Sequence, residues 1–223
     1  MKIPFNPTIN EFNELKDDIS EAVKSCLESG WYVLGDQVKR FEEGFAKEMG
    51  ASFSIGVASG VDAITLILMG LGIAENDEVI VPAFTAFPSI TGIQRAGAKP
   101  VLVDVCLSTG LLDIEKVEAA ITKKTKAILP VHLYGQCCDL VALKYIAEKY
   151  NLKIIEDCAQ ATGARCHNVN AGTVGVAGAF SFYPTKNLGA MGDGGAIVTH
   201  DRTLYERCKA LRNYGQTKKN KFD

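Results

Sequence analysis

The sequence predicts an α/β fold built around one mostly parallel sheet, and three observations support this. Short runs rich in β-branched residues recur along the chain, and helix-like stretches separate most of them. The runs are apolar throughout rather than alternating, as is typical of strands covered on both faces. In chain order they span residues 52–58, 77–82, 99–105, 125–131, 152–157, 177–183 and 195–200.

The helix-like stretches show apolar residues at helical spacing. The clearest example, residues 139–150, places Leu140, Leu143, Ile146 and Ala147 on one face. The other stretches span residues 61–71, 113–120 and 201–211. Strands that alternate with helices in this way indicate a parallel sheet with helices on both faces.

Composition excludes several classes of function. The chain has 223 residues and a net charge of −2, which gives no basic surface for a nucleic-acid partner. The apolar runs are too short to span a bilayer, and the N-terminus has no apolar signal segment, so we expect a cytoplasmic protein without membrane contact. The seven cysteines are scattered and read as reduced thiols. The adjacent pair Cys137 and Cys138 lacks metal-ligand spacing, so no metal site is expected.

Polar or aromatic residues follow five of the predicted strands at the point where each ends. The carboxyl ends of the strands are where open α/β sheets bind ligands, so these segments should converge on one rim. They are SGVD (59–62), FTAFPS (84–89), HLYG (132–135), EDCAQ (156–160) and PTKN (184–187).

Three of these segments indicate functional groups, and each has a purely structural alternative. The Ser59-Gly60 turn into a helix can bind an anion through free N–H groups, or Ser59 can simply cap the helix. Glu156 and Asp157 should point to opposite sides of their strand, one toward the ligand rim; the alternative is a cap for the next helix. A partly desolvated lysine amine such as Lys186 suits Schiff-base chemistry, whereas most loop lysines are only solvated.

Taken together, an anion cradle, a buried carboxylate and an amine indicate one cofactor. Pyridoxal phosphate (PLP) needs an amine for its aldehyde, a carboxylate for its ring nitrogen and anchors for its phosphate. The sequence has neither GxxxxGK[ST] nor GxGxxG, so the common nucleotide-binding loops are absent from it.

The motifs also carry a resemblance. GVASGVDAI, VPAFTA, VHLYGQ, IIEDCAQATGAR and FSFYPTKNLGAMGDGGAIVT are similar to segments of the DegT/DnrJ/EryC1/StrS family of PLP-dependent aminotransferases, which act on nucleotide-linked keto-sugars. The resemblance runs from residue 5 to residue 216. It implies an aspartate-aminotransferase-like type I fold, a seven-stranded sheet with one antiparallel strand, and a homodimer with active sites at its interface.

The resemblance assigns roles to matching residues. Lys186 would bind the PLP aldehyde as a Schiff base and then shuttle the proton, while Asp157 would pair with the ring nitrogen. Gln160 would hydrogen-bond the phenolic oxygen. Ser181 would hold the phosphate together with the backbone of Gly60 and Val61.

Two positions depart from the family pattern. Many relatives place an aromatic residue where this chain has Ala86, so Phe87 is expected to stack on the cofactor ring, with Phe84 as the alternative. Val61 replaces a common threonine, which leaves the phosphate to the backbone N–H there.

The resemblance predicts an enzyme of amino-sugar biosynthesis. It would convert a keto-deoxysugar linked to a nucleotide, with dTDP favoured, into an amino sugar, using an amino-acid donor such as glutamate. Residues 1–223 would form the PLP-binding large domain, and the small C-terminal domain of the family is not in this sequence. The alternative is an inactive PLP-binding or dimerisation fragment of such an enzyme. For His132, a hydrogen-bonded structural role is favoured over a role toward substrate.

Overall fold

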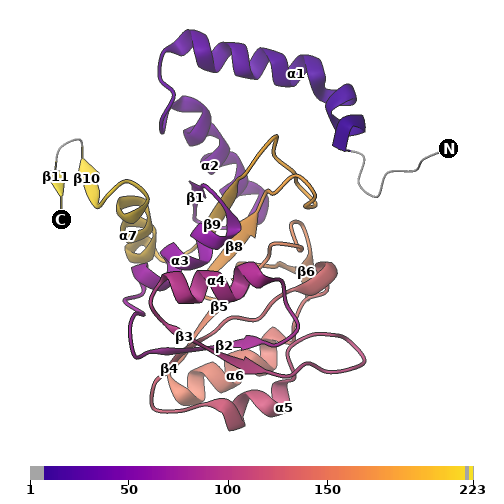
Figure 1. The fold of residues 1–223 in the computed structure, drawn as a ribbon, viewed down its shortest axis with the longest axis vertical. Helices are drawn as coiled ribbons and strands as arrows, with labels where there is room; N and C mark the ends of the chain where they lie inside the picture. Colours follow the sequence, from indigo (N-terminus) through magenta and orange to yellow (C-terminus); the bar gives the residue numbers. More distant parts are fainter. Residues whose placement is uncertain (1–7, 219–220, 223) are drawn as a thin grey trace.

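The structure is a computed structural model that describes residues 8–218 and 221–222 (Figure 1). Residues 5–7, the first that resemble the family, therefore lie outside the described residues. Seven strands form the main sheet in the spatial order β1-β9-β8-β5-β4-β2-β3. Their bounds are β1 (Phe53–Val57), β2 (Glu78–Pro82), β3 (Lys99–Val103), β4 (Thr125–Ile128), β5 (Lys153–Asp157), β8 (Ala177–Ser181) and β9 (Gly195–Thr199).

The strand directions confirm the mostly parallel sheet. Strand β9 pairs antiparallel with both β1 and β8, while the pairs β8–β5, β5–β4, β4–β2 and β2–β3 are parallel. All seven predicted runs are strands of this sheet. The run predicted at residues 125–131 ends earlier, at Ile128, because Pro130 has no N–H to donate to a ladder.

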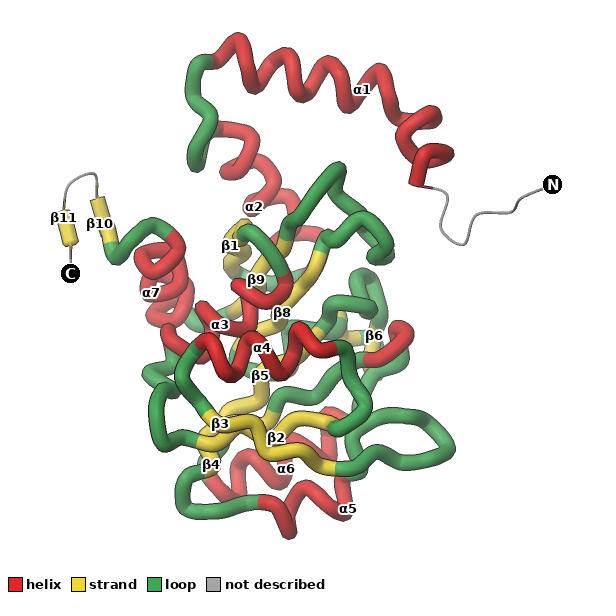
Figure 2. The backbone as a smooth tube through the Cα atoms, viewed as in Figure 1, coloured by secondary structure: helices red, strands yellow, loops and turns green. Residues whose placement is uncertain are grey.

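Helices lie on both faces of the sheet, and two small hairpins lie outside it (Figure 2). The four predicted helical stretches correspond to α3, to α5 with η1, to α6 and to α7, whereas α1, α2 and α4 were not predicted. The bounds are α1 (Thr8–Ser29), α2 (Asp36–Met49), α3 (Gly60–Gly70), α4 (Phe87–Arg95), α5 (Ile114–Val117), η1 (Glu118–Ala120), η2 (Leu133–Gly135), α6 (Leu140–Tyr150) and α7 (Arg202–Arg212). The hairpins pair β6 (Arg165–Cys166) with β7 (Val169–Asn170) and β10 (Gln216–Lys218) with β11 (Lys221–Phe222).

The core lies on both faces of the sheet. Along β5, Ile155 packs in the cluster that includes residues of α3 and α7, whereas its neighbour Ile154 packs in the cluster that includes residues of α6. Strand β2 is buried along its whole length, which explains its continuously apolar sequence. Because successive side chains alternate, Glu156 shares the α6 face with Ile154 and Asp157 shares the α3 face with Ile155.

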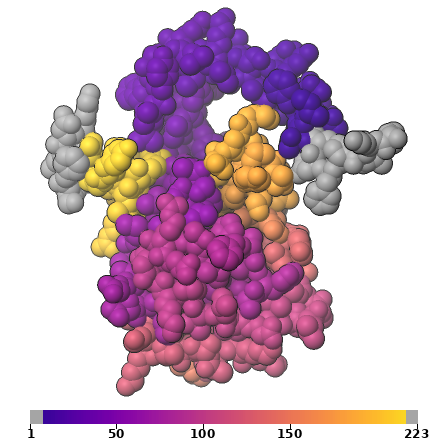
Figure 3. Space-filling view, viewed as in Figure 1, coloured from indigo at the N-terminus to yellow at the C-terminus, as the bar shows by residue number. Residues whose placement is uncertain are grey.

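Helix α1 is the exception to this packing. None of its residues is buried, and it projects from the body as an arch (Figure 3). Within the described part of the chain, no helix is long and apolar enough to cross a membrane.

Candidate functional site

The five predicted strand ends do converge on one cavity. It is bordered by the segments that follow β1, β2, β4, β5 and β8, and it lies where the carboxyl ends of the parallel strands meet. The polar side chains that line it are Ser59, Thr85, Ser89, Asp157, Gln160, Ser181 and Lys186, joined by the backbone of Gly60 and Val61.

The first wall of the cavity is the N-terminus of α3. Ser59 caps this helix, since its Oγ accepts a hydrogen bond of 3.1 Å from the Asp62 N–H. The first intrahelical bond is donated by the Ala63 N–H to the Ser59 carbonyl, so the N–H groups of Gly60 and Val61 precede the helical ladder. The cap and the anion-binding end therefore occur together, and the two interpretations of this turn do not exclude each other.

Two glycines bring this turn against the sheet. A Cβ on Gly60 would lie 2.8 Å from the Cβ of Ser181, and a Cβ on Gly195 would lie 2.4 Å from the carbonyl carbon of Ser59. Larger residues would separate the helix end from β8 and β9. The close approach places the Ser181 hydroxyl beside the first turn of α3, as an anion cradle requires.

Asp157 forms the floor of the cavity. Its side chain is buried and has one donor on each oxygen: the Ser89 Oγ lies 2.7 Å from Oδ2, and the Ala159 N–H lies 3.1 Å from Oδ1. Burial raises the pKa of this carboxyl above its ordinary value; the two hydrogen bonds and the charge of Lys186 act in the opposite direction. A cation that binds beside such a carboxyl favours its ionised form.

Glu156 has a different role, as the alternation of side chains predicts. Its Oε2 lies 2.8 Å from the Nε2 of His132, and its two oxygens also accept the N–H groups of Gly172, Val174 and Gly175. Glu156 thus fixes the loop before β8 and does not face the cavity.

The same network fixes His132. Its Nδ1 accepts a hydrogen bond of 3.1 Å from the Cys138 N–H, so its proton is on Nε2 and points to Glu156. This agrees with the structural role favoured for His132. The buried atoms of His132, Glu156 and Cys158 lie within 4.8 Å of one another, but the first two residues already use their polar atoms in these hydrogen bonds.

Gln160 and Lys186 complete the polar lining of the cavity. The Gln160 Oε1 accepts a hydrogen bond of 2.9 Å from the Tyr134 N–H, which leaves its amide NH₂ as the remaining donor. Lys186 is half-buried in the loop after β8, where its backbone N–H donates to the Tyr183 carbonyl at 2.8 Å. Its side chain borders the cavity together with Asp157.

Phe87 is the predicted site residue that the structure does not bring to the cavity. Its side chain is 78% exposed, and the residues that border the cavity there are Ala86 and Pro88. The alternative, Phe84, is 51% exposed and also lies outside the lining. Helix α4 begins at Phe87, and stacking of this side chain on a bound ring stays a prediction.

Sequence reasoning overlooked Ser89 and Thr85 as site residues. Ser89 is buried and bonds Asp157, and the Thr85 Oγ1 lies 2.8 Å from the Ser89 Oγ. The signal was present in FTAFPS, because both hydroxyl residues follow the carboxyl end of a strand, where open α/β sheets bind ligands.

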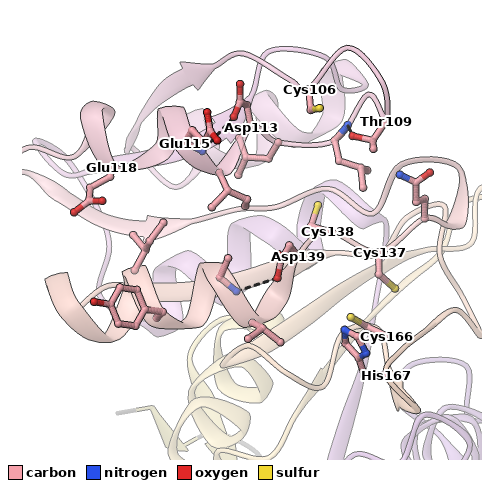
Figure 4. Close-up of a pocket in the computed structure, with 18 residues that line it drawn as sticks. Cys106, Thr109, Asp113, Glu115, Glu118, Cys137, Cys138, Asp139, Cys166 and His167 are labelled. Atoms are coloured by element: carbon pink, nitrogen blue, oxygen red, sulfur yellow. Dashed lines mark hydrogen bonds between the residues drawn. The ribbon is translucent and has the colours of Figure 1, made fainter.

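A larger hollow lies elsewhere, between the segment before α5, the start of α6 and the β6–β7 hairpin (Figure 4). It measures about 1150 Å³ but suits an anion poorly. Its charged lining consists of Asp113, Glu115, Glu118 and Asp139, and among the described residues that border it none is Lys or Arg.

The fold and the site together define a class of protein. It is an α/β protein that holds an amine, a buried carboxylate and an anion cradle in one cavity. The sequence profile of the DegT/DnrJ/EryC1/StrS aminotransferase family matches residues 13–223. The chain belongs to this family, which confirms the resemblance.

Relatives and solved structures agree with that assignment. The dTDP-3-amino-3,6-dideoxy-alpha-D-galactopyranose transaminase of Aneurinibacillus thermoaerophilus is 54% identical over 202 residues, covering 91% of this chain and 56% of that protein. The crystal structure of DesV from S. venezuelae, in complex with a ketimine intermediate, has a TM-score of 0.96 and 44% identity, covering 100% of this chain and 60% of DesV. NtdA from Bacillus subtilis, with bound cofactor PMP, has a TM-score of 0.93 and 34% identity, covering 100% of this chain and 51% of NtdA.

These comparisons confirm the aspartate-aminotransferase-like type I fold with its mostly parallel seven-stranded sheet. The chain is shorter than these three proteins and spans between 51% and 60% of the length of each.

Proposed function

We propose that this chain binds pyridoxal phosphate in the cavity at the carboxyl ends of the strands. We propose further that it acts as an aminotransferase of nucleotide-linked keto-sugars. The observation that carries the proposal is the convergence of Lys186, Asp157 and Ser181 with the first turn of α3 in one cavity. These groups match the aldehyde, ring nitrogen and phosphate of the cofactor in chemical type.

The residues present fit the cofactor group by group. Lys186 would bind the aldehyde, and the buried Asp157 would hold the ring nitrogen in its protonated form. The amide NH₂ of Gln160, whose oxygen is taken by Tyr134, would donate to the phenolic oxygen. Ser181 and the N–H groups of Gly60 and Val61 would hold the phosphate.

The chemistry then divides between cofactor and protein. When bound, PLP supplies an aldehyde that carries the amino group and a ring that accommodates electron density. The protein would supply the base: the Nζ of Lys186 would take a proton from the carbon that bears the amino group and return one. Asp157 contributes a fixed negative charge in a buried setting, where its electrostatic effect is stronger than in water.

The substrate proposed is a dTDP-linked keto-deoxysugar, with an amino acid such as glutamate as donor. The transaminase of A. thermoaerophilus, 54% identical, is named for a dTDP-linked dideoxy amino sugar, which supports this class. Family membership supports transfer of an amino group.

The test loads the purified chain with pyridoxamine phosphate and adds a dTDP-linked keto-deoxysugar. We expect mass spectrometry to detect the amino sugar with the wild type and with Lys144→Ala, an exposed lysine on α6, but not with Lys186→Ala. The second candidate is a PLP-binding or dimerisation fragment without turnover, and the relatives named as transaminases support the first candidate over it. Cofactor binding without any amino sugar would select the second candidate.

We further propose a cytoplasmic homodimer. Support for the compartment comes from the seven cysteines, all of them free. Support for the dimer comes from exposed apolar side chains after α1, where Trp31 is 66% and Val33 is 73% exposed. Sedimentation should give twice the 24.0 kDa mass of the chain, and a purely monomeric chain at high concentration would contradict the dimer.

A further inference from the structure

Behind the Asp157 carboxylate lies a short chain of hydroxyl groups from α4 and the segment before it. The Ser89 Oγ donates to the Asp157 Oδ2 at 2.7 Å, and the Thr85 Oγ1 lies 2.8 Å from the Ser89 Oγ. Both residues border the cavity, yet Ser89 is only 2% exposed.

The chemistry of the three groups determines which one donates in each of the two hydrogen bonds. An ionised carboxylate can only accept, so the single proton of Ser89 is committed to Asp157. The Ser89 oxygen is then free to accept, and Thr85 must be the donor of the second bond. The order is therefore Thr85 to Ser89 to Asp157.

The arrangement also fixes the orientation of the carboxylate. Oδ2 is held by Ser89 from α4, and Oδ1 is held by the Ala159 N–H from the segment after β5. With one donor on each oxygen the carboxyl group cannot rotate without breaking a buried hydrogen bond, which is costly. Charge-assisted hydrogen bonds of this kind also favour the ionised form over the neutral one.

We propose that Ser89, supported by Thr85, is a positioning residue that holds Asp157 ionised and aimed at the ring nitrogen of the cofactor. This inference rests on the proposed function, because it concerns the same cavity. It adds that the strength of the contact between Asp157 and the ring depends on two hydroxyl groups that do not themselves touch the ring nitrogen.

The experiment compares two ligands that differ at one atom. Pyridoxamine phosphate has a ring nitrogen, and its deaza analogue has a carbon there; neither carries the aldehyde that would react with Lys186. Equilibrium dialysis with the full chain gives the affinity of each ligand for the wild type, Ser89→Ala, Ser89→Thr and Thr85→Val. Thr91→Val is the matched control: Thr91 is half-buried in the same helix, and its hydroxyl donates to the Phe87 carbonyl rather than to Asp157.

We expect Ser89→Ala to weaken binding of pyridoxamine phosphate about five- to tenfold, as loss of one hydrogen bond of ordinary net strength implies, and to change binding of the deaza analogue less than twofold. Ser89→Thr should restore most of the affinity because it keeps the hydroxyl. Thr85→Val should have a smaller effect of the same kind, and Thr91→Val should have none.

Three results would overturn the inference. Equal weakening of both ligands by Ser89→Ala would show a structural role only, and unchanged binding of both would show no role. A wild type that binds neither ligand would contradict the proposed function itself, and the positioning role with it.

Discussion

Asp157 is costly to bury as an ionised carboxylate, and the same charge is what would pair with the ring nitrogen of the cofactor. Burial raises the pKa of this carboxyl, while the Ser89 hydroxyl, the Ala159 N–H and the charge of Lys186 oppose that rise. Neutral asparagine can occupy the same place: its oxygen would accept from Ala159, and its NH₂ would donate to Ser89, whose proton would turn toward Thr85.

We therefore expect Asp157→Asn to leave the cofactor-free chain as stable as the wild type at pH 7, or more stable by about 1 kcal/mol, and to weaken pyridoxamine phosphate binding at least tenfold. A folded pKa above the unfolded value means that the contribution of the carboxyl to stability is present at low pH and is lost as the pH rises through the folded pKa. The advantage of the variant should thus grow with pH and then become constant.

Urea unfolding of both proteins from pH 4 to pH 8 measures this difference. Lys186→Ala serves as a control for loss of a nearby charge. An asparagine variant that is less stable than the wild type at pH 7 by more than about 1 kcal/mol would contradict the account of the buried carboxyl.

At the residue scale, the sequence alone predicted those cavity residues whose chemistry is unusual for their position in the chain. Lys186 and Asp157 stood out because an amine and a carboxylate beside apolar strands need a reason. Ser89 did not, because serine at the start of a helix is common and its contact with Asp157 joins residues 68 positions apart. Phe87 lies outside the cavity lining, because the direction of a side chain at a helix start depends on backbone geometry that the sequence does not show, and its stacking on the cofactor ring stays a prediction.

At the scale of single elements, the first turn of α3 depends on how closely β8 approaches it. The Cβ of an alanine at Gly60 would meet the Ser181 Cβ at 2.8 Å, below ordinary van der Waals contact, and both atoms belong to short, rigid parts of their residues. The glycine is needed for space rather than for an unusual backbone angle.

Gly60→Ala should therefore widen the anion cradle. We expect a loss of about 1–3 kcal/mol in the free energy of unfolding, together with a marked loss of pyridoxamine phosphate binding. Gly44→Ala is the matched control: Gly44 lies inside α2 with no atom within 4 Å of an added Cβ, so alanine should stabilise that helix by about 0.5–1 kcal/mol.

Urea unfolding and equilibrium dialysis give both quantities for each variant. If Gly60→Ala behaved like Gly44→Ala in both assays, the close approach of α3 to β8 would not be what forms the cradle.

The elements that the sequence predicted are those with a repeating apolar pattern. The strands and α6 were predicted because burial on both faces or on one helical face leaves a clear period. Helix α4 was missed because it is 9 residues long and buries only Ser89, Gly92 and Ile93. Helix α1 buries no residue in the described structure, although Ile9, Phe12, Ile19 and Val23 follow a helical spacing that could have predicted it.

For the whole molecule, convergence of the strand ends was predictable and the order of the strands was not. Parallel strands present their carboxyl ends at one edge, so five polar segments had to meet there whatever the order. The order β1-β9-β8-β5-β4-β2-β3 brings together strands far apart in the chain, such as β1 and β9, and no local pattern specifies that pairing. The presence of one antiparallel strand came from the family resemblance and is confirmed, and that strand is β9.

We propose that this arrangement of strand ends puts Lys186 in position to capture the aldehyde of PLP. The most direct measurement incubates the purified chain with PLP, reduces it with borohydride and maps the modified peptide by mass spectrometry. We predict a single pyridoxyl group on Lys186, absent from Lys186→Ala and retained in Lys144→Ala. A pyridoxyl group spread over surface lysines, or none on Lys186, would contradict the claim.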